Sequence, residues 1–255
     1  MEILSLIFIS FICIILFRST KYDTKGILGE KKVASILSSL SHKKYKVIND
    51  VLIKSGSMTF QIDHIVVSIY GIFVIETKNY KGLITGFEDS EYWIKNIFKN
   101  KYEFYNPIKQ NAGHILALSK KLHLTDDKFI SIIVFSNEAS LKVKTSQKVV
   151  YMSELNKSIK QYRKIKFSSN EVDDLVEKIR SYNVKNMATK KQHISNVKNI
   201  ITNRQKLIKQ KLCPICGSSL ILKNKNSKNF FVCSNFPKCR FTKLSDFNFY
   251  NFFII

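Results

Sequence analysis

Acidic residues are scarce in this 255-residue chain, which has 19 Asp and Glu against 42 Lys and Arg and a net charge of +23. Between Asn183 and Ser245 there is no Asp or Glu at all, although this stretch carries 14 Lys and Arg. A compositional bias alone would spread the basic residues evenly, so their distribution indicates a binding surface. The two classes of partner that such a surface fits are nucleic acid and an acidic membrane.

Charge is also absent near the start of the chain, where Ile3–Phe17 consists of apolar side chains and two serines. A helix of this length spans about 22 Å, so flanking residues are needed to cross a hydrocarbon core of about 30 Å. The segment lacks a basic start and small residues at its end, which argues against a cleaved signal peptide. Arg18, Lys21 and Lys25 follow it, and the positive-inside rule then places the remainder in the cytoplasm. We expect residues 1–20 to be a single-pass anchor in the cytoplasmic membrane, with a buried helix or a signal peptide as alternatives.

Hydrophobic residues make up 45% of the chain and charged residues 24%, a balance that is typical of a globular protein and not of a disordered one. Apolar periodicity and turn residues predict helices that alternate with strands. This order indicates an α/β fold with a mixed sheet flanked by helices. The predicted elements are helices at 29–40, 106–123, 153–162 and 169–182, strands at 45–53, 58–68, 71–78, 129–136 and 149–151, and a strand or loop around Trp93.

Composition divides the chain after the anchor. Residues 24–182 hold the alternating elements and are expected to form one α/β domain. Residues 183–208 are basic and polar, with apolar residues at helical spacing, which predicts a helical linker. Residues 209–245 hold four cysteines and are expected to form a small module. The tail at 246–255 is strongly apolar and is compatible with a strand, a cover for a sheet or a membrane contact.

Two of the predicted strands bring acidic residues together. Side chains alternate along a strand, so Glu76 and Lys78 share one face. A short turn centred between Ile69 and Tyr70 then places Asp63 opposite Glu76, with Cβ atoms about 5 Å apart. Facing carboxylates repel each other unless a cation lies between them, and their oxygens are ligands that Mg²⁺ or Mn²⁺ prefers. The hairpin therefore predicts a site for a hard divalent ion.

The alternative interpretation of Glu76 and Lys78 is an ordinary pair of solvated charges at a strand end, which is what most such pairs are. Asp63 favours the catalytic interpretation, because Ile62 and Ile65 flank it and an unpartnered carboxylate is costly to bury.

Four motifs carry a family resemblance: Gly26–Glu30, Gln61–His64, Gly71–Gly82 and Asn106–Gln110. Over roughly residues 25–135 the chain resembles the nuclease-related domain (NERD) family, and the motifs follow the family's order. That family is assigned to the PD-(D/E)xK nuclease superfamily, so the resemblance implies a restriction-endonuclease-like fold. The site residues that the resemblance implies are Glu30, Asp63, Glu76, Lys78 and Gln110.

The activity expected from this site is metal-assisted hydrolysis of phosphodiester bonds by an endo- or exodeoxyribonuclease. Asp63, Glu76 and the Thr77 carbonyl would hold Mg²⁺ or Mn²⁺. Lys78 would position the attacking water and stabilise the transition state. Glu30 would ligate the metal directly or through water, although a Glu in the first turn of a helix is also favourable by itself.

Three polar residues around these have more open roles. Gln110 would orient a ligand or touch the DNA backbone, or it is simply a polar residue at a helix start. His64 points away from Asp63 by alternation and is expected to be structural. His114 lies one helical turn after Gln110 and is a possible neighbour of the site.

The cysteines outside the anchor form two pairs with the spacing of metal ligands, far from any signal of secretion, which predicts metal binding in a reducing compartment and not disulfides. Four thiolates complete a tetrahedron, so we expect structural Zn²⁺. Gly217 directly follows the first pair and permits a tight turn. The ligands are Cys213, Cys216, Cys233 and Cys239.

The cysteine module resembles the C-terminal zinc ribbons of type IA topoisomerases, and that resemblance implies contact with single-stranded DNA. Aromatic and basic residues interleave along it, so that rings can stack on bases while cations follow phosphates. The alternative is that the phenylalanines pack inside the ribbon, with one or two exposed. The residues expected to bind nucleic acid are Lys223, Lys225, Lys228, Phe231, Phe236, Lys238, Arg240 and Phe241.

These features predict a membrane-anchored, metal-dependent nuclease that acts on DNA and holds nucleic acid with a zinc ribbon. One alternative is a non-catalytic nucleic-acid-binding protein that retains the nuclease fold. Another is a membrane-associated adaptor whose basic surface binds anionic lipid.

Overall fold

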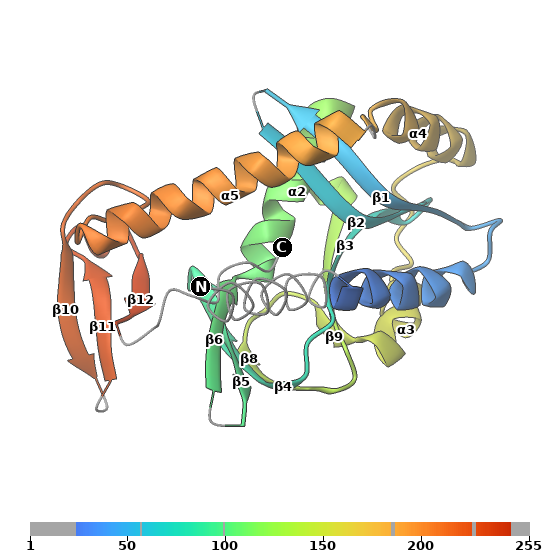
Figure 1. Cartoon of the computed structure of the whole chain (residues 1–255). Helices are drawn as coiled ribbons and strands as arrows, with labels where there is room; N and C mark the ends of the chain where they lie inside the picture. Colours follow the sequence, from blue (N-terminus) through green and yellow to red (C-terminus); the bar gives the residue numbers. More distant parts are fainter. Residues whose placement is uncertain (1–23, 57, 99, 185–186, 226–227, 246–255) are drawn as a thin grey trace, which may run out of the picture.

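The computed structural model describes residues 24–56, 58–98, 100–184, 187–225 and 228–245 (Figure 1). The anchor expected at 1–20 and the apolar tail at 246–255 lie outside these ranges. Within the ranges, no helix is both long and apolar enough to cross a membrane.

The described residues form a mixed α/β body with sheets flanked by helices, as the sequence predicts, followed by a small cysteine-containing sheet (Figure 1). The strands are β1 (Tyr45–Ser55), β2 (Met58–Ser68), β3 (Gly71–Lys78), β4 (Gly82–Phe87), β5 (Tyr92–Ile97), β6 (Asn100–Tyr105), β7 (Phe129–Phe135), β8 (Ala139–Lys144), β9 (Val149–Tyr151), β10 (Leu220–Lys225), β11 (Lys228–Cys233) and β12 (Thr242–Leu244). The helices are residues 24–38, α2 (Pro107–Leu122), α3 (Leu155–Lys160), α4 (Ser169–Ser181) and α5 (Met187–Lys209).

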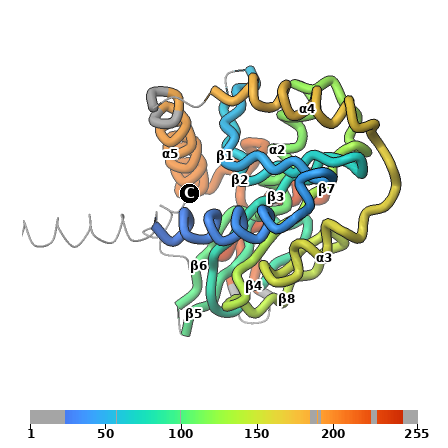
Figure 2. The backbone as a smooth tube through the Cα atoms, turned by 90° about the vertical axis from the view of Figure 1, so that its right-hand side faces the viewer, coloured from blue at the N-terminus to red at the C-terminus, as the bar shows by residue number. Residues whose placement is uncertain are grey.

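A five-stranded sheet in the order β1–β2–β3–β7–β9 forms the centre of the body. Its first three strands are antiparallel, whereas β7 and β9 run parallel to β3. Alternation along β3 divides the core, because Ile72 and Val74 pack with α2 and α4 while Phe73 and Ile75 pack with α3 and the helix at 24–38. Helices therefore cover both faces of the sheet (Figure 2).

The β2–β3 hairpin has the predicted register, which runs from the turn to His64 opposite Ile75. The next positions along the two strands are Asp63 and Glu76, which therefore lie at the same end of the hairpin. Gly71 begins β3 with φ +137°, a backbone angle that residues with a Cβ rarely adopt, so the turn requires glycine.

A second sheet, in the order β6–β5–β4–β8, lies beside the end of β7. Trp93 of β5 is fully buried and its ring stacks on that of Phe135, with 6.1 Å between the ring centroids. The segment around Trp93 is thus a strand, one of the two structures considered for it. The neighbouring β4, β6 and β8 were not predicted.

Helix α2 begins where the sequence predicts. The Asn106 side chain accepts a hydrogen bond from the backbone N–H of Ile108 at 3.0 Å, and Pro107 occupies the first helical position. The amide of Asn106 also donates to the carbonyls of Glu88 and Ser90, which lead into β5. One buried side chain therefore caps α2 and fixes the start of this helix against the second sheet.

The basic segment after residue 183 is helical, as predicted, and this helix packs against the α/β body. α5 extends from the edge of the five-stranded sheet to the cysteine module (Figure 1). At one end His193 hydrogen bonds to Thr59 of β2 through Nδ1 at 2.7 Å, and farther along Arg204 forms an ion pair with the buried carboxylate of Glu91. These contacts fix α5 on the α/β body.

The three-stranded sheet β10–β11–β12 is docked on the second sheet of the body. Lys243 forms an ion pair with Glu103 of β6, and both side chains are only 3% exposed. Tyr92 packs against the apolar centre of this small sheet, and an exposed pair, Arg240 with Asp89 at 3.1 Å, lies at the rim.

Candidate active site and zinc ribbon

The end of the β2–β3 hairpin gathers two acids and a lysine. The backbone N–H of Thr77 donates to Asp63 Oδ2 at 2.7 Å, which holds this carboxylate against β3. Lys78 Nζ donates to Glu76 Oε1 at 2.7 Å, so the two side chains share one face, as alternation requires. The structure therefore brings Asp63, Glu76 and Lys78 together.

The two acids form an electrostatically unfavourable pair. Burial raises the pKa of Asp63 well above its usual range, the charges of Glu76 and Glu30 raise it further, and Lys78 opposes the shift only in part. Glu76 is 1% exposed, and within the described residues its Oε2 has no hydrogen-bond partner. A buried carboxylate oxygen that accepts no hydrogen bond from the described residues, next to a second acid, fits a ligand set for a divalent cation.

The charges around Lys78 keep its side chain protonated. Burial lowers its pKa, but the nearby charges of Glu76, Tyr80 and Asp63 more than offset this effect and hold the pKa above its usual value. Its Nζ also donates to Gln110 Oε1 at 3.0 Å, which ties the first turn of α2 to the site. Lys78 is therefore suited to stabilise negative charge and is not suited to accept a proton.

The helix at residues 24–38 brings Glu30 to the same place. Asn79, directly after Lys78, donates through Nδ2 to the carbonyl of Lys25 at 2.8 Å. A Cβ at Gly29 would lie 2.4 Å from the Cβ of Asn79, so only glycine permits this close approach. The charge of Glu30 acts on the Asp63 carboxyl as a result.

The two histidines near the acids have different surroundings. His64 is buried, its Nδ1 lies 2.8 Å from Asn49 Oδ1, and burial lowers its pKa to about 4, which agrees with the expected structural role. His114 Nδ1 lies 3.5 Å from Glu76 Oε2, and burial lowers the pKa of this histidine as well. The spacing of four residues from Gln110 was the signal in the sequence that placed His114 beside the site.

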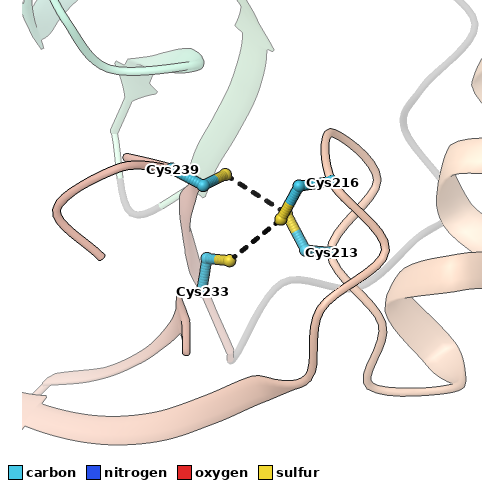
Figure 3. A group of neighbouring side chains, drawn as sticks. All are labelled: Cys213, Cys216, Cys233 and Cys239. Carbon is cyan, nitrogen blue, oxygen red and sulfur yellow. Dashed lines mark hydrogen bonds between the residues drawn. The ribbon is translucent and has the colours of Figure 1, made fainter. Parts of the chain in front are cut away.

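The cysteines converge on a single point, as Figure 3 shows. Within the described ranges they are the only group of three or more His, Cys, Asp or Glu side chains whose ligand atoms all lie within 4.8 Å of one another. The sulfur of Cys213 lies 3.6 Å from that of Cys239, and the sulfur of Cys216 lies 3.4 Å from that of Cys233. Four thiolates about 2.3 Å from a zinc ion have sulfur–sulfur distances of about 3.8 Å, so this cluster fits structural Zn²⁺.

Local backbone geometry forms the first half of the cluster. Gly217, after Cys216, has φ +74°, and its N–H donates to the Cys213 carbonyl at 2.8 Å, as a tight turn requires. Hydrogen bonding with the side chain and backbone of Ser218 lowers the pKa of the Cys216 thiol to about 6. That shift favours the thiolate, which is the form that binds zinc.

The structure separates the predicted nucleic-acid contacts of the ribbon into two kinds. Phe236 is 58% exposed, and the side chains of Lys223, Lys238 and Arg240 are exposed as well, although Arg240 pairs with Asp89. Phe241 is fully buried and Phe231 packs against the same apolar centre. Phe241 therefore belongs to the ribbon core and is not available to stack on a base, a correction to its expected role. The side chains of Lys225 and Lys228 lie outside what the structure describes.

Comparisons with known proteins agree with both parts of the chain. Residues 25–136 match the family model of the nuclease-related domain, and residues 210–248 match that of the topoisomerase DNA binding C4 zinc finger. The chain is 37% identical over 177 residues to an uncharacterized protein of Bacillus anthracis, an alignment that covers 67% of this chain and 82% of that protein. No solved structure matches the chain. The chain therefore belongs to the nuclease-related domain family and carries a zinc ribbon of the topoisomerase type.

Proposed function

We propose that this protein is a metal-dependent nuclease that hydrolyses DNA phosphodiester bonds and that its ribbon binds nucleic acid. The observation that carries the proposal is the meeting of Asp63, Glu76 and Lys78 at one end of the β2–β3 hairpin. The family match supports a nuclease-related function, and the C4 zinc finger supports nucleic-acid binding.

Asp63, Glu76 and the carbonyl of Thr77 would hold Mg²⁺ or Mn²⁺, and Glu30 would assist directly or through water. Such an ion supplies Lewis-acid stabilisation of the charge that develops on the phosphate. The N–H of Thr77 holds one oxygen of Asp63 in place, while Glu76 keeps Oε2 free of hydrogen bonds within the described residues. The two carboxylates are thus positioned before a substrate arrives, which reduces the cost of organising the site.

Lys78 acts in this proposal as a donor and not as a base. An ammonium group has three donors, and the two hydrogen bonds of Lys78 go to Glu76 and Gln110. The third donor would bind a non-bridging phosphate oxygen or orient the attacking water. Gln110 would hold the ammonium group in the orientation that this contact requires.

Alanine substitution of the acids tests the proposal. With the full-length chain and labelled DNA, Asp63→Ala and Glu76→Ala should each lower Mg²⁺- or Mn²⁺-dependent cleavage by at least about 10²-fold, because each removes charge from the metal site. Asp174→Ala, which changes an exposed acid of α4, is the matched control and should cleave normally. Undiminished cleavage by the site variants would refute the mechanism. A wild-type chain that binds DNA but never cleaves it would instead support the non-catalytic alternative.

Nucleic-acid binding by the ribbon is proposed from its exposed ring, that of Phe236, and its exposed cations, Lys223 and Lys238 among them. Stacking of a base on an aromatic side chain contributes about 1–3 kcal/mol, so Phe236→Ala should weaken single-strand binding by roughly tenfold. Ile215→Ala, which removes an exposed aliphatic side chain of the same module, should not. Binding should also weaken as salt is added, and equal affinities of the two variants at low salt would contradict the stacking role.

We also propose that residues 1–20 anchor the protein in the cytoplasmic membrane, with the nuclease on the cytoplasmic side. The uncharged stretch at Ile3–Phe17 and the basic residues that follow it support this location. Cell fractionation of the full chain and of a variant without residues 1–20 tests it. A full chain that is recovered in the soluble fraction would contradict the anchor.

A further inference from the structure

A buried lysine outside the proposed active site has no carboxylate partner among the residues that the structure describes. Lys95 lies two residues after Trp93 on β5, on the same inward face, and is 7% exposed. Lysine is almost never buried in this way unless a charged group is paired with it. Within the described ranges its ammonium group forms no ion pair and lies instead over two rings, 4.2 Å from the centroid of Tyr80 and 5.4 Å from that of Tyr102.

Lys95 and Lys78 both lie close to Tyr80. Burial raises the pKa of the Tyr80 hydroxyl, and the next largest influences on it are the charges of Lys78 and Glu76, so this ring borders the site. The backbone of Lys25 lies beside Asn79, the residue before Tyr80, because its carbonyl accepts the hydrogen bond from the Asn79 side chain. Burial and the charge of Lys25 together lower the pKa of Lys95 to about 8. The positive charge of Lys25 thus acts on the buried ammonium group of Lys95.

We propose that Lys95 and Lys25 bind a backbone phosphate of the nucleic acid, next to the phosphate that the proposed function places at Asp63 and Glu76. This inference rests on the proposed function and adds a second phosphate position to it. The rings of Tyr80 and Tyr102 stabilise the ammonium group of Lys95 through cation–π contact. A carboxylate would neutralise it, whereas a ring leaves its charge available to an anion. A phosphate between the two lysines removes their repulsion and compensates the burial of Lys95.

Nucleic-acid binding by full-length variants tests the inference independently of cleavage. Titrations use a labelled oligonucleotide over a range of salt concentrations, without added divalent ions. Lys95→Met should lower affinity by at least about threefold at each salt concentration and should reduce the slope of log K against log salt by about 1, the effect of one lost phosphate contact. Lys95→Arg should keep the wild-type slope.

The matched control is Lys144→Met, which removes a lysine of β8 that also lies over a ring, that of Phe87, at 5.9 Å. Its salt slope should equal that of the wild type. Thermal unfolding separates binding from structure, because Lys95→Met removes an unpaired buried charge and should raise Tm, whereas a lysine needed only for the fold would lower it. Unchanged affinity and slope in Lys95→Met, or the same loss in Lys144→Met, would overturn the inference. Absence of cleavage by the wild type would reject the nuclease proposal and leave this binding test decisive.

Discussion

Asp63 is buried beside the carboxylate of Glu76. The repulsion between the two negative charges favours a bound cation, and it destabilises the folded state when no cation is bound. The pKa of Asp63 in the folded chain lies above that of an unfolded Asp, about 3.9, so the folded state binds more protons. By linkage, the stability cost is absent below pH about 3.9, grows as the pH rises and is complete above the folded-state pKa. At neutral pH the charged form therefore destabilises the metal-free protein.

Asp63→Asn should consequently raise Tm at neutral pH without divalent ions, while it removes a ligand. The asparagine oxygen can still accept the hydrogen bond from Thr77, so the fold keeps this contact. Added Mg²⁺ should raise the Tm of the wild type and leave that of Asp63→Asn unchanged, because only the wild type binds the ion at this site. Thermal scans with and without Mg²⁺ measure both effects, with Asp174→Asn as the exposed control. A variant less stable than the wild type at neutral pH would contradict the electrostatic account.

Among the helices and strands, sequence patterns predicted the elements that are stabilised by interactions between residues close in the sequence. The bounds of β2, β3 and β9 were predicted as observed, and the helix predicted at 106–123 begins at Asn106, the N-cap of α2. The meeting of Asp63 and Glu76 could be predicted because a hairpin with a two-residue turn fixes its own register. The position of His114 beside Glu76 depends on how α2 packs on β3, and only its spacing from Gln110 hinted at it.

The second sheet was missed because its stability comes from distant parts of the chain. β4 pairs with β8, in a register that begins with Gly82 opposite Ala139, and no local pattern reports such a pairing. Acids with buried side chains also disturb its alternation, among them Glu103 of β6 and Glu91, which directly precedes β5. Their cationic partners come from distant elements, Lys109 of α2, Arg204 of α5 and Lys243 of the ribbon, so no local pattern in the sequence shows that these acids are buried.

Two glycines of the helix at 24–38 allow a matched test of how an element positions the site. A Cβ at Gly29 would lie 2.4 Å from that of Asn79, whereas a Cβ at Gly26 would meet nothing within 4 Å. Gly29→Ala should push the helix and Glu30 away from the hairpin, lower stability by about 1–3 kcal/mol and reduce cleavage. Gly26→Ala should preserve cleavage and add a little stability, because alanine favours helix by up to about 1 kcal/mol over glycine. Denaturant unfolding and cleavage rates measure these effects, and equal behaviour of the two variants would contradict the close-packing role of Gly29.

At the scale of the whole molecule, the ribbon and the α/β body form one docked structure. The basic part of the chain after residue 182 has no acids of its own between Asn183 and Ser245, so the cations through which it contacts the body find their partners there. Arg204 pairs with Glu91, and Lys243 pairs with Glu103. The surplus of positive charge thus has two uses, since a few cations fix α5 and the ribbon while the exposed ones remain for an anionic partner.

The buried pair should control docking much more strongly than the exposed one. Removal of one member of a buried ion pair leaves an uncompensated charge and costs about 3–5 kcal/mol, whereas an exposed pair contributes about 0–1 kcal/mol. Lys243→Met should therefore release the ribbon from β6, seen as faster proteolysis of the segment between α5 and β10, while Arg240→Ala should not. Combining Lys243→Met with Glu103→Leu should restore much of the loss, because no buried charge then remains. If Lys243→Met alone left proteolysis unchanged, the pair would not hold the ribbon. If the double variant was cleaved as fast as Lys243→Met, docking would require the ion pair itself, and the cost of an unpaired buried charge would not explain the loss.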